Sequence, residues 1–255
     1  MENIELILYI AIFTMGTFIG SFLNVVIYRV PIKESIVFGR SHCTNCNTQI
    51  KNYDLVPIFS YLILKGKCRN CKSVISPRYA IVEFFTGVIF LIAFLINGLN
   101  PLSIAIAGFS AILIVITLID LDTMTIPDSL LVAIAVLIVP FAILQNNITI
   151  QERILGFFII SFPMFVLTMI IGGAFGGGDI KFMAVCGALL GAKDISVAMF
   201  IAILLGGIYS IYILLTKKVE KGTHIPFGPY LCVGCYIAVL YGTQIIDWYL
   251  MQLYS

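Results

Sequence analysis

The stretch Gly176-Gly177-Gly178-Asp179-Ile180-Lys181 places one acidic side chain inside a glycine run that separates two apolar segments. A second acidic stretch, Asp120–Asp128, follows another apolar segment upstream. An aspartate at the bilayer centre costs roughly 2.5–3.5 kcal/mol on insertion scales, so an acid near hydrocarbon is expected to be functional and to have a partner. We therefore predict that Asp120 and Asp179 are partners in one site.

The composition predicts an all-α polytopic membrane protein. Of the 255 residues, 60% are apolar and only 11% are charged. Several apolar runs approach the ~20 residues that cross a hydrocarbon core of ~30 Å. These runs are continuous, whereas the strands of a membrane barrel alternate between apolar and polar residues, so helices are the expected spanning elements. The same composition argues against a soluble globular fold.

We expect about eight transmembrane segments, one of them short, at residues 4–27, 79–96, 102–119, 130–144, 154–171, 180–193, 196–215 and 230–250. Nine of the fifteen Lys and Arg residues lie between Arg29 and Arg78, so the positive-inside rule assigns this loop to the cytoplasm. Eight crossings then leave both termini outside and bring residues 31–78, 120–128, 172–181 and 217–227 to the cytoplasmic face. The basic charges are scattered rather than gathered in a stripe, which argues against a nucleic-acid partner.

Four of the seven cysteines form two close pairs in the basic loop, Cys43-x2-Cys46 and Cys68-x2-Cys71, with twenty-one residues between the pairs. Each pair fits a tight turn that aims two thiolates at one point, and two such turns complete a tetrahedral zinc site. A reducing cytoplasm favours metal over disulfides, although chance or redox pairing is the alternative. Four thiolates leave no open coordination position, so the predicted zinc is structural and its binding energy helps to fold the loop.

The two aspartates suit more than one chemistry. Two carboxyl groups held close together share a proton and titrate as a pair, as in aspartyl proteolysis. The glycines beside Asp179 would let a substrate backbone approach closely, because no Cβ intervenes. The same acids and glycines would also suit a cation or proton pathway, and the residues alone do not choose between these two functions.

A family resemblance does favour one of them. The chain closely resembles the bacterial prepilin peptidases, also called type IV leader peptidases, which are intramembrane aspartyl proteases of the GxGD type. The resemblance covers almost the whole length and rests on Gly20–Pro31, the paired CxxC loop, Tyr79–Glu83, Asp120–Asp128, Gly176–Lys181 and Ile225–Pro229. The glycine-aspartate motif alone is shared with presenilin-like proteases and would be weaker evidence.

The resemblance implies that Asp120 and Asp179 are the catalytic residues, with Asp122 as a possible modulator or substitute. It implies a pilin or pseudopilin precursor as substrate, cut after the glycine that ends a short basic leader, at the cytoplasmic face of the bacterial cytoplasmic membrane. The rival function is an ion- or proton-coupled transporter that uses intramembrane carboxylates. A lesser rival is a non-catalytic assembly subunit.

Family members with the cysteine loop also N-methylate the new N-terminal residue with S-adenosylmethionine. By resemblance we assign the donor site to Asn24, Arg29 and Glu83, which would equally serve to pack the loop against the first helix. One departure is Tyr79-Ala80, where the family often has Tyr-Pro. The chain is thus divided into residues 1–30, a first transmembrane segment with the methyltransferase-type motif, 31–78, the zinc-binding loop, and 79–255, the peptidase domain.

Three local features carry smaller expectations. Gly16 and Gly20 are four residues apart, which permits close helix packing. Asp128 or Ser129 follows Pro127 and is well placed to cap the next helix. Cys232 and Cys235 form a third CxxC, but they lie in an apolar segment without further ligands and are expected to pack in the core. A partner for Lys181, either Asp179 or a lipid headgroup, cannot be chosen from the sequence.

Overall fold

The computed structural model of the protein describes residues 2–145, 147–216 and 225–254. The predicted turn at 217–227 therefore lies largely outside the described residues. The helices are α1 (Glu2–Arg29), η1 (Asn52–Leu55), α2 (Phe59–Ile63), α3 (Arg78–Asn97), α4 (Pro101–Thr123), α5 (Asp128–Leu144), α6 (Ile150–Ile159), α7 (Ser161–Ile171), α8 (Gly177–Thr216) and α9 (Gly228–Tyr254). Six apolar helical spans of the described chain are long enough to cross a membrane, and α5 is a shorter apolar helix. The prediction of an all-α polytopic membrane protein is confirmed.

The chain divides into two compact units, Met1–Ser103 and Ile104–Ser255, called unit 1 and unit 2 below. Unit 1 holds α1, the cysteine loop with η1 and α2, and α3. Its two long helices approach closely at glycine: a Cβ added to Gly16 would lie 2.8 Å from the Cα of Gly87, and one added to Gly20 would lie 2.7 Å from the Cα of Glu83. The predicted close packing at these two glycines is therefore present.

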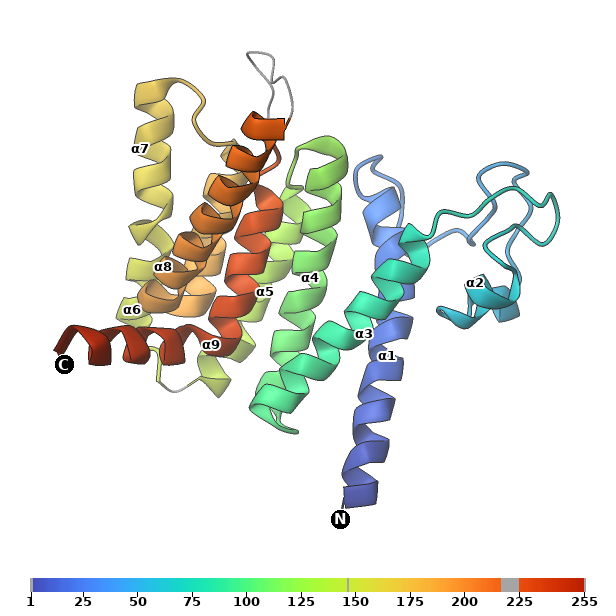
Figure 1. The fold of residues 1–255 in the computed structure, drawn as a ribbon, viewed down its shortest axis with the longest axis horizontal. Coiled ribbons are helices and arrows are strands. Elements are labelled where there is room, and N and C mark those ends of the chain that lie inside the picture. The colour runs from blue at the N-terminus through green and yellow to red at the C-terminus, as the bar shows by residue number, and fades with distance from the viewer. Residues whose placement is uncertain (1, 146, 217–224, 255) are drawn as a thin grey trace. The chain divides into compact units, whose positions relative to one another are not determined.

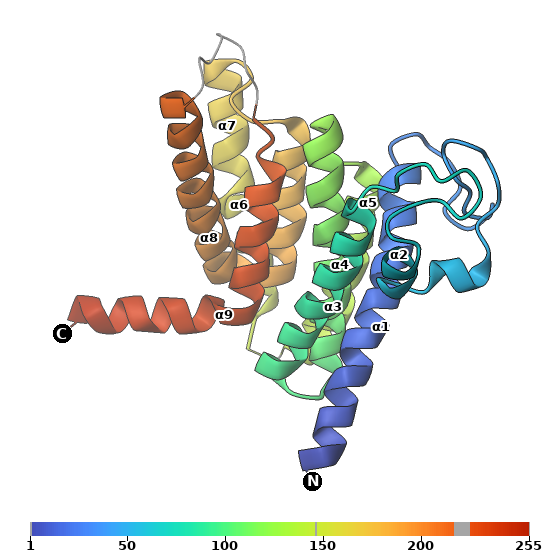
Figure 2. The same cartoon turned by 45° about the vertical axis from the view of Figure 1, so that its right-hand side comes forward.

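In unit 2, α8 contains a break in the helix at Gly191, where φ is 83° and ψ is 169°. Figure 2 shows the lighter first arm and the darker second arm of α8 as separate helices that run in opposite directions. A positive φ of this kind favours glycine, which has no Cβ to clash with the backbone. The two arms correspond to the predicted segments 180–193 and 196–215, so the short crossing ends in a sharp turn at Gly191 and not in a loop.

The first arm of α8 is held against α6 at its C-terminal end. Any Cβ at Gly156 or Gly187 would overlap the backbone of the other helix, so these two helices touch through glycine. The buried Arg153 donates from Nη1 to the carbonyl oxygens of Ala188, at 3.2 Å, and Leu189, at 2.5 Å. Because the last carbonyls of a helix lack intrahelical partners, this arginine stabilises the end of the arm.

The last helix, α9, changes surroundings along its length. Its residues are mostly buried up to Gly242 and mostly exposed after it. In Figures 1 and 2 the C-terminal part of α9, drawn in dark red, turns crosswise to the preceding part. The predicted segment 230–250 is therefore helical throughout but not straight.

Candidate active site

Asp120 lies in the last turn of α4, and only 4% of its surface is exposed. Its Oδ2 accepts a hydrogen bond from the backbone nitrogen of Gly228 at 3.0 Å. Gly228 is the first residue of α9, so the carboxylate satisfies one of the free N–H groups that begin a helix. A Cβ added at Gly228 would lie 2.6 Å from that Oδ2, so only glycine fits beside the carboxylate.

Asp179 lies in the first turn of α8 and is half-buried. The glycine run before it makes this position possible. Gly172 ends α7 in the left-handed conformation, with φ of 72°, and α8 begins five residues later at Gly177. The Asp179 carboxylate accepts a hydrogen bond from the backbone of Gly176, which is one half of a helix-capping arrangement.

The structure brings the two predicted acids together within unit 2. The carboxyl groups of Asp120 and Asp179 lie close enough to interact electrostatically. The turn after α4 packs directly on the glycine run, because a Cβ at Gly178 would lie 3.1 Å from the Cβ of the buried Ile126. Two carboxyl groups from different helices therefore lie near one another in unit 2.

The neighbouring acids behave differently. Asp122 is exposed. Asp128 is the first residue of α5, but its side chain does not cap this helix, so the capping prediction is wrong: the N-cap is Pro127. Instead, Asp128 forms an ion pair with Lys181, whose Nζ lies 2.9 Å from Oδ1. The protein partner of Lys181 is therefore Asp128 and not Asp179, because the folded turn brings Asp128 within reach.

A possible metal centre lies in unit 1. The sulfurs of Cys43, Cys46, Cys68 and Cys71 all lie within 4.8 Å of one another, and those of Cys43 and Cys71 are 3.8 Å apart. A Zn–S distance of about 2.3 Å puts the sulfurs of a tetrahedral site about 3.8 Å apart, so this donor set fits zinc. Hydrogen bonds from the side chain and backbone of Ser73 lower the pKa of the Cys71 thiol to about 6.

The two cysteine pairs have equivalent backbones. In each, the amide of the first cysteine donates to a carbonyl five residues later, from Cys43 to Thr48 at 3.0 Å and from Cys68 to Ser73 at 2.8 Å. The residue after the second cysteine has a positive φ in both, 54° at Asn47 and 61° at Lys72. Each pair is thus a tight turn that directs two sulfurs to the same side, as the spacing predicted.

Unit 1 also contains a cavity of about 880 Å³, formed by the end of α1, the cysteine loop and the start of α3. Asn24, Arg29 and Glu83, the three residues assigned to a donor site by resemblance, all line it. Small-molecule sites commonly measure about 300–1,000 Å³ and combine apolar walls with a few polar groups. The cavity is therefore large enough for a cofactor-sized ligand.

Two of these residues hold the cavity walls together. The buried Arg29 donates from Nη1 to the carbonyl oxygens of Ser35, at 2.9 Å, and Phe38, at 3.0 Å. The side-chain nitrogen of Asn24 donates to the carbonyl oxygen of Tyr79 at 3.1 Å, which ties α1 to α3. Arg29 thus packs the loop against the first helix, the second role that the sequence left open.

Glu83 supports a strained turn. Its Oε2 accepts from the backbone nitrogen of Ile58 at 2.7 Å, and the Ser21 side chain also hydrogen-bonds to it. Ile58 has φ of 60° and ψ of −53°, a conformation that a β-branched residue rarely adopts. Such backbone persists only where its surroundings hold it, so Glu83 helps to position the wall of the cavity between η1 and α2.

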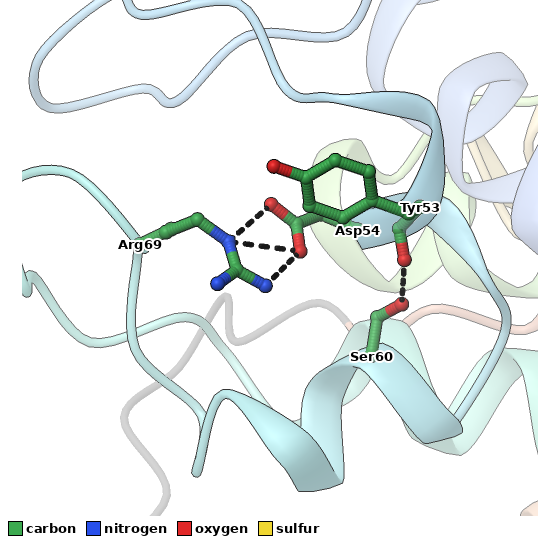
Figure 3. A network of polar contacts seen from close by, with 4 residues as sticks. All are labelled: Tyr53, Asp54, Ser60 and Arg69. Carbon is green, nitrogen blue, oxygen red and sulfur yellow. Dashed lines mark hydrogen bonds and ion pairs between the residues drawn. The ribbon is translucent and has the colours of Figure 1, made fainter.

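An ion pair between Arg69 and Asp54 connects the metal centre to the cavity (Figure 3). Arg69, which lies between two of the cysteines in sequence, binds both carboxylate oxygens of Asp54 through Nε and Nη2, the shortest distance being 2.6 Å. The guanidinium also lies 5.2 Å from the ring centroid of Tyr53. Asp54 and Arg69 both line the cavity, so this pair connects a cysteine turn to η1.

This ion pair makes the folding of unit 1 depend on pH. Hydrogen bonding to Arg69 holds the pKa of Asp54 below its usual value. The stabilisation is therefore fully present above the unfolded pKa of about 3.9 and is lost as pH falls through the lower folded pKa. We expect Asp54→Asn and Arg69→Gln to increase protease cleavage between η1 and α2 at neutral pH, and the effects of the two substitutions to be non-additive.

The measurement is limited proteolysis of both single variants and the double variant at several pH values. Half of the Arg69 side chain is exposed, at 49%, so a small effect is expected. Non-additivity should disappear below the folded pKa of Asp54. Strict additivity at neutral pH would contradict an interaction between the two side chains.

Sequence reasoning missed several of these residues. Gly228 lies in a motif, Ile225–Pro229, that supported the resemblance, but its contact with Asp120 spans 108 residues of chain. Ile58 and Asp54 carry no local signal, because their partners lie on other elements. Around this cavity, the family resemblance singled out Asn24, Arg29 and Glu83.

Comparison with known proteins agrees with the two units. Residues 14–96 match the family described as Bacterial Peptidase A24 N-terminal domain, and residues 107–211 match the Type IV leader peptidase family. No solved structure matches the chain. The boundary between the two family matches falls where the structure divides the chain.

Curated relatives match over nearly the full length. The chain is 31% identical to the prepilin leader peptidase/N-methyltransferase of Bacillus subtilis (strain 168), over 94% of this chain and 96% of the relative. It is 31% identical to a protein of the same name from Neisseria gonorrhoeae, over 92% of each chain. It is 35% identical to the type 4 prepilin-like proteins leader peptide-processing enzyme of Escherichia coli O78:H11, over 89% of this chain and 91% of the relative.

Full-length identity above 30% and matches to both family descriptions identify the kind of protein. Together with the six apolar spans, they make it a multi-pass bacterial membrane enzyme. The chain belongs to the type IV leader peptidase family, the bacterial prepilin peptidases.

Proposed function

We propose that the protein removes the short basic leader from type IV prepilin-like precursors, cutting after the leader glycine by means of Asp120 and Asp179. The observation that carries the proposal is the pair of carboxyl groups, from the end of α4 and the start of α8, that interact electrostatically within unit 2. In a protein of this family, such a pair is the expected catalytic group.

The chemistry needs little from the chain beyond these two side chains. One carboxylate takes a proton from water, and the water oxygen attacks the scissile carbonyl carbon. The second carboxyl group, protonated, donates a hydrogen bond to the carbonyl oxygen, and the amide nitrogen gains a proton as the C–N bond breaks. Gly176, Gly177 and Gly178 beside Asp179 leave room for an extended peptide backbone.

The location of the cut follows from charge. A basic leader stays on the cytoplasmic side, while the apolar helix that follows it in a pilin lies in the bilayer. In this proposal the acids lie at the cytoplasmic face of the membrane. In this orientation, Asp120 and Asp179 lie where the leader meets the bilayer.

We further propose that the cavity of unit 1 holds S-adenosylmethionine, which when bound supplies a methyl group for the new N-terminal amine. This ligand carries a sulfonium cation, and the cavity offers the Glu83 carboxylate and the rings of Tyr28, Tyr61 and Tyr79, groups that attract a cation. A structural zinc bound by Cys43, Cys46, Cys68 and Cys71 would hold the loop that forms one side of the cavity.

The direct test of cleavage uses the full chain in membrane vesicles with a pilin precursor. We expect mass spectrometry to show release of the leader after glycine and, with S-adenosylmethionine added, one methyl group on the new N-terminus. A precursor whose leader glycine is replaced should remain uncut. No cleavage, together with an ion flux that depends on Asp120 and Asp179, would instead favour the transporter.

The donor site has its own test. We expect Glu83→Gln to weaken binding of radiolabelled S-adenosylmethionine about tenfold or more, because a charge-assisted contact contributes about 1.5–3 kcal/mol. The amide oxygen can still accept from Ile58, so the wall of the cavity should stay in place. The matched control is Glu34→Gln. Glu34 is an exposed acid of the cysteine loop, residues 31–78, and it does not line the cavity. Equal affinity in all three proteins would exclude Glu83 from the donor site.

A further inference from the structure

The C-terminal segment of α9, residues 243–253, is not explained by either proposed activity. Burial along α9 ends at Gly242. Beyond it, large apolar side chains are exposed, among them Tyr249 at 58%, Leu250 at 41% and Leu253 at 61%. Side chains of this size are unfavourable in water, so the segment needs an apolar environment.

The segment begins beside a group of charged side chains at one end of unit 2. A Cβ added at Gly242 would overlap the carboxylate of Asp194, so α9 meets α8 at this point. Asp194 follows the break at Gly191, and next to it Lys193 pairs with Glu152 at 4.0 Å. Charged side chains are costly inside hydrocarbon, so this end of unit 2 lies at headgroup level.

The direction of the segment is informative. A straight continuation of eleven residues would carry its end about 16 Å beyond this charged level, into water. Figures 1 and 2 instead show the dark red end of α9 crosswise to the part before it. A crosswise helix that starts at headgroup level stays at that level along its whole length.

The residue pattern of the segment matches such a position. At 100° per residue, one arc of the helix carries Ile245, Ile246, Tyr249, Leu250 and Leu253, whereas the opposite arc carries Gln244, Asp247, Trp248, Met251 and Gln252. All the strongly polar side chains of residues 244–253 thus fall on one side. This is the pattern of a helix that lies in a membrane interface, where tryptophan and tyrosine are also enriched.

We propose that residues 243–253 form an interfacial helix that lies along the bilayer surface, on the side of the membrane where the break at Gly191 lies. Its apolar arc enters the boundary between headgroups and acyl chains, and Gln244 and Asp247 face water. The segment contains no Lys or Arg, so its contact with lipid is apolar and needs no anionic headgroup. Zwitterionic phospholipid is therefore a sufficient partner.

Trp248 allows a direct test, because it is the single tryptophan of the chain. The full chain is reconstituted in phosphatidylcholine vesicles, and its fluorescence is quenched in turn by a nitroxide lipid labelled near the headgroup, by one labelled deep in the acyl chain, and by acrylamide. We expect the shallow label to quench several-fold more strongly than the deep one, with acrylamide having partial access.

Each other result would overturn the proposal. Strongest quenching by the deep label would mean that the segment crosses the bilayer. Full access to acrylamide without lipid quenching would place it in water. Protection from all three quenchers would mean that protein covers it, for example a second copy of the chain.

Two controls keep the depth assignment secure. A Trp248→Phe variant that also carries Phe200→Trp moves the probe to an exposed apolar position of the second arm of α8, where the deep label should quench more. Leu250→Asn and Met251→Asn change neighbouring residues on opposite arcs. The first should raise acrylamide quenching of Trp248 several-fold, and the second should leave it nearly unchanged.

Discussion

Asp120→Asn and Asp179→Asn are each expected to lower leader cleavage by about 10²–10⁴-fold, the usual contribution of a positioned acid or base. Each substitution keeps the size of the side chain and one hydrogen-bond acceptor, so Gly228 retains its contact with residue 120. What is removed is the group that takes or gives a proton. The measurement is the initial rate of precursor cleavage in vesicles with matched amounts of enzyme.

The matched controls for this experiment are Asp122→Asn and Asp128→Asn. Asp122 is exposed and Asp128 is paired with Lys181, and neither carboxylate is proposed to act on substrate. We expect both variants to retain most of the activity. Binding of S-adenosylmethionine in unit 1 reports whether each protein is intact. Normal cleavage by Asp120→Asn together with loss in Asp122→Asn would move the catalytic role to residue 122.

The second large effect is expected at the metal centre. A Cys43→Ser, Cys46→Ser double variant should lose its bound zinc and bind S-adenosylmethionine at least tenfold more weakly. The loop between the cysteine pairs has few buried apolar residues, so metal binding supplies much of its folding free energy. Loss of the metal would also release Arg69, which connects the second cysteine turn to Asp54 at the cavity wall.

The chain offers a matched control for this change as well. Cys232 and Cys235 have the same spacing but are buried in α9 as packing residues. Their double serine variant should keep one zinc per chain, measured by atomic absorption. A cysteine-loop variant that retains one zinc per chain would contradict the assigned ligands. A variant that loses zinc but binds S-adenosylmethionine normally would show that the cavity does not depend on the metal.

The sequence predicted the candidate sites best where a residue type was rare in its surroundings or recurred at a fixed spacing. The paired cysteines could be grouped because two short CxxC turns leave few other geometries, and their sulfurs do converge. Asp120 and Asp179 stood out because acids are rare at the ends of apolar segments, and the structure brings them into electrostatic contact. The polytopic helical character was also predictable, since hydrocarbon thickness sets the length of a spanning helix; of the about eight segments expected, the described chain shows six candidate spans and the shorter α5.

Contacts between distant parts of the chain could not be predicted in this way. Lys181 pairs with Asp128 because the turn after α4 folds onto the start of α8, a tertiary event without a local signature. The bond between Glu83 and Ile58 depends on a strained turn that no propensity would favour. Gly228 is required by the volume of the Asp120 side chain, which is visible once α4 and α9 are packed together.

The short helices of unit 2 have a consequence for the surrounding bilayer. The first arm of α8, residues 177–190, and the buried part of α9, residues 228–242, rise about 21–22 Å at 1.5 Å per residue, less than a hydrocarbon core of ~30 Å. In the proposed arrangement, hydrophobic mismatch at the lipid-facing sides of these helices thins the lipid locally. Asp179 and the hydrogen-bond donor to Asp120 lie at the ends of these two helices. In the proposed mechanism, local thinning shortens the path of water to the carboxylates, so bilayer thickness becomes a variable of the hydrolysis rate.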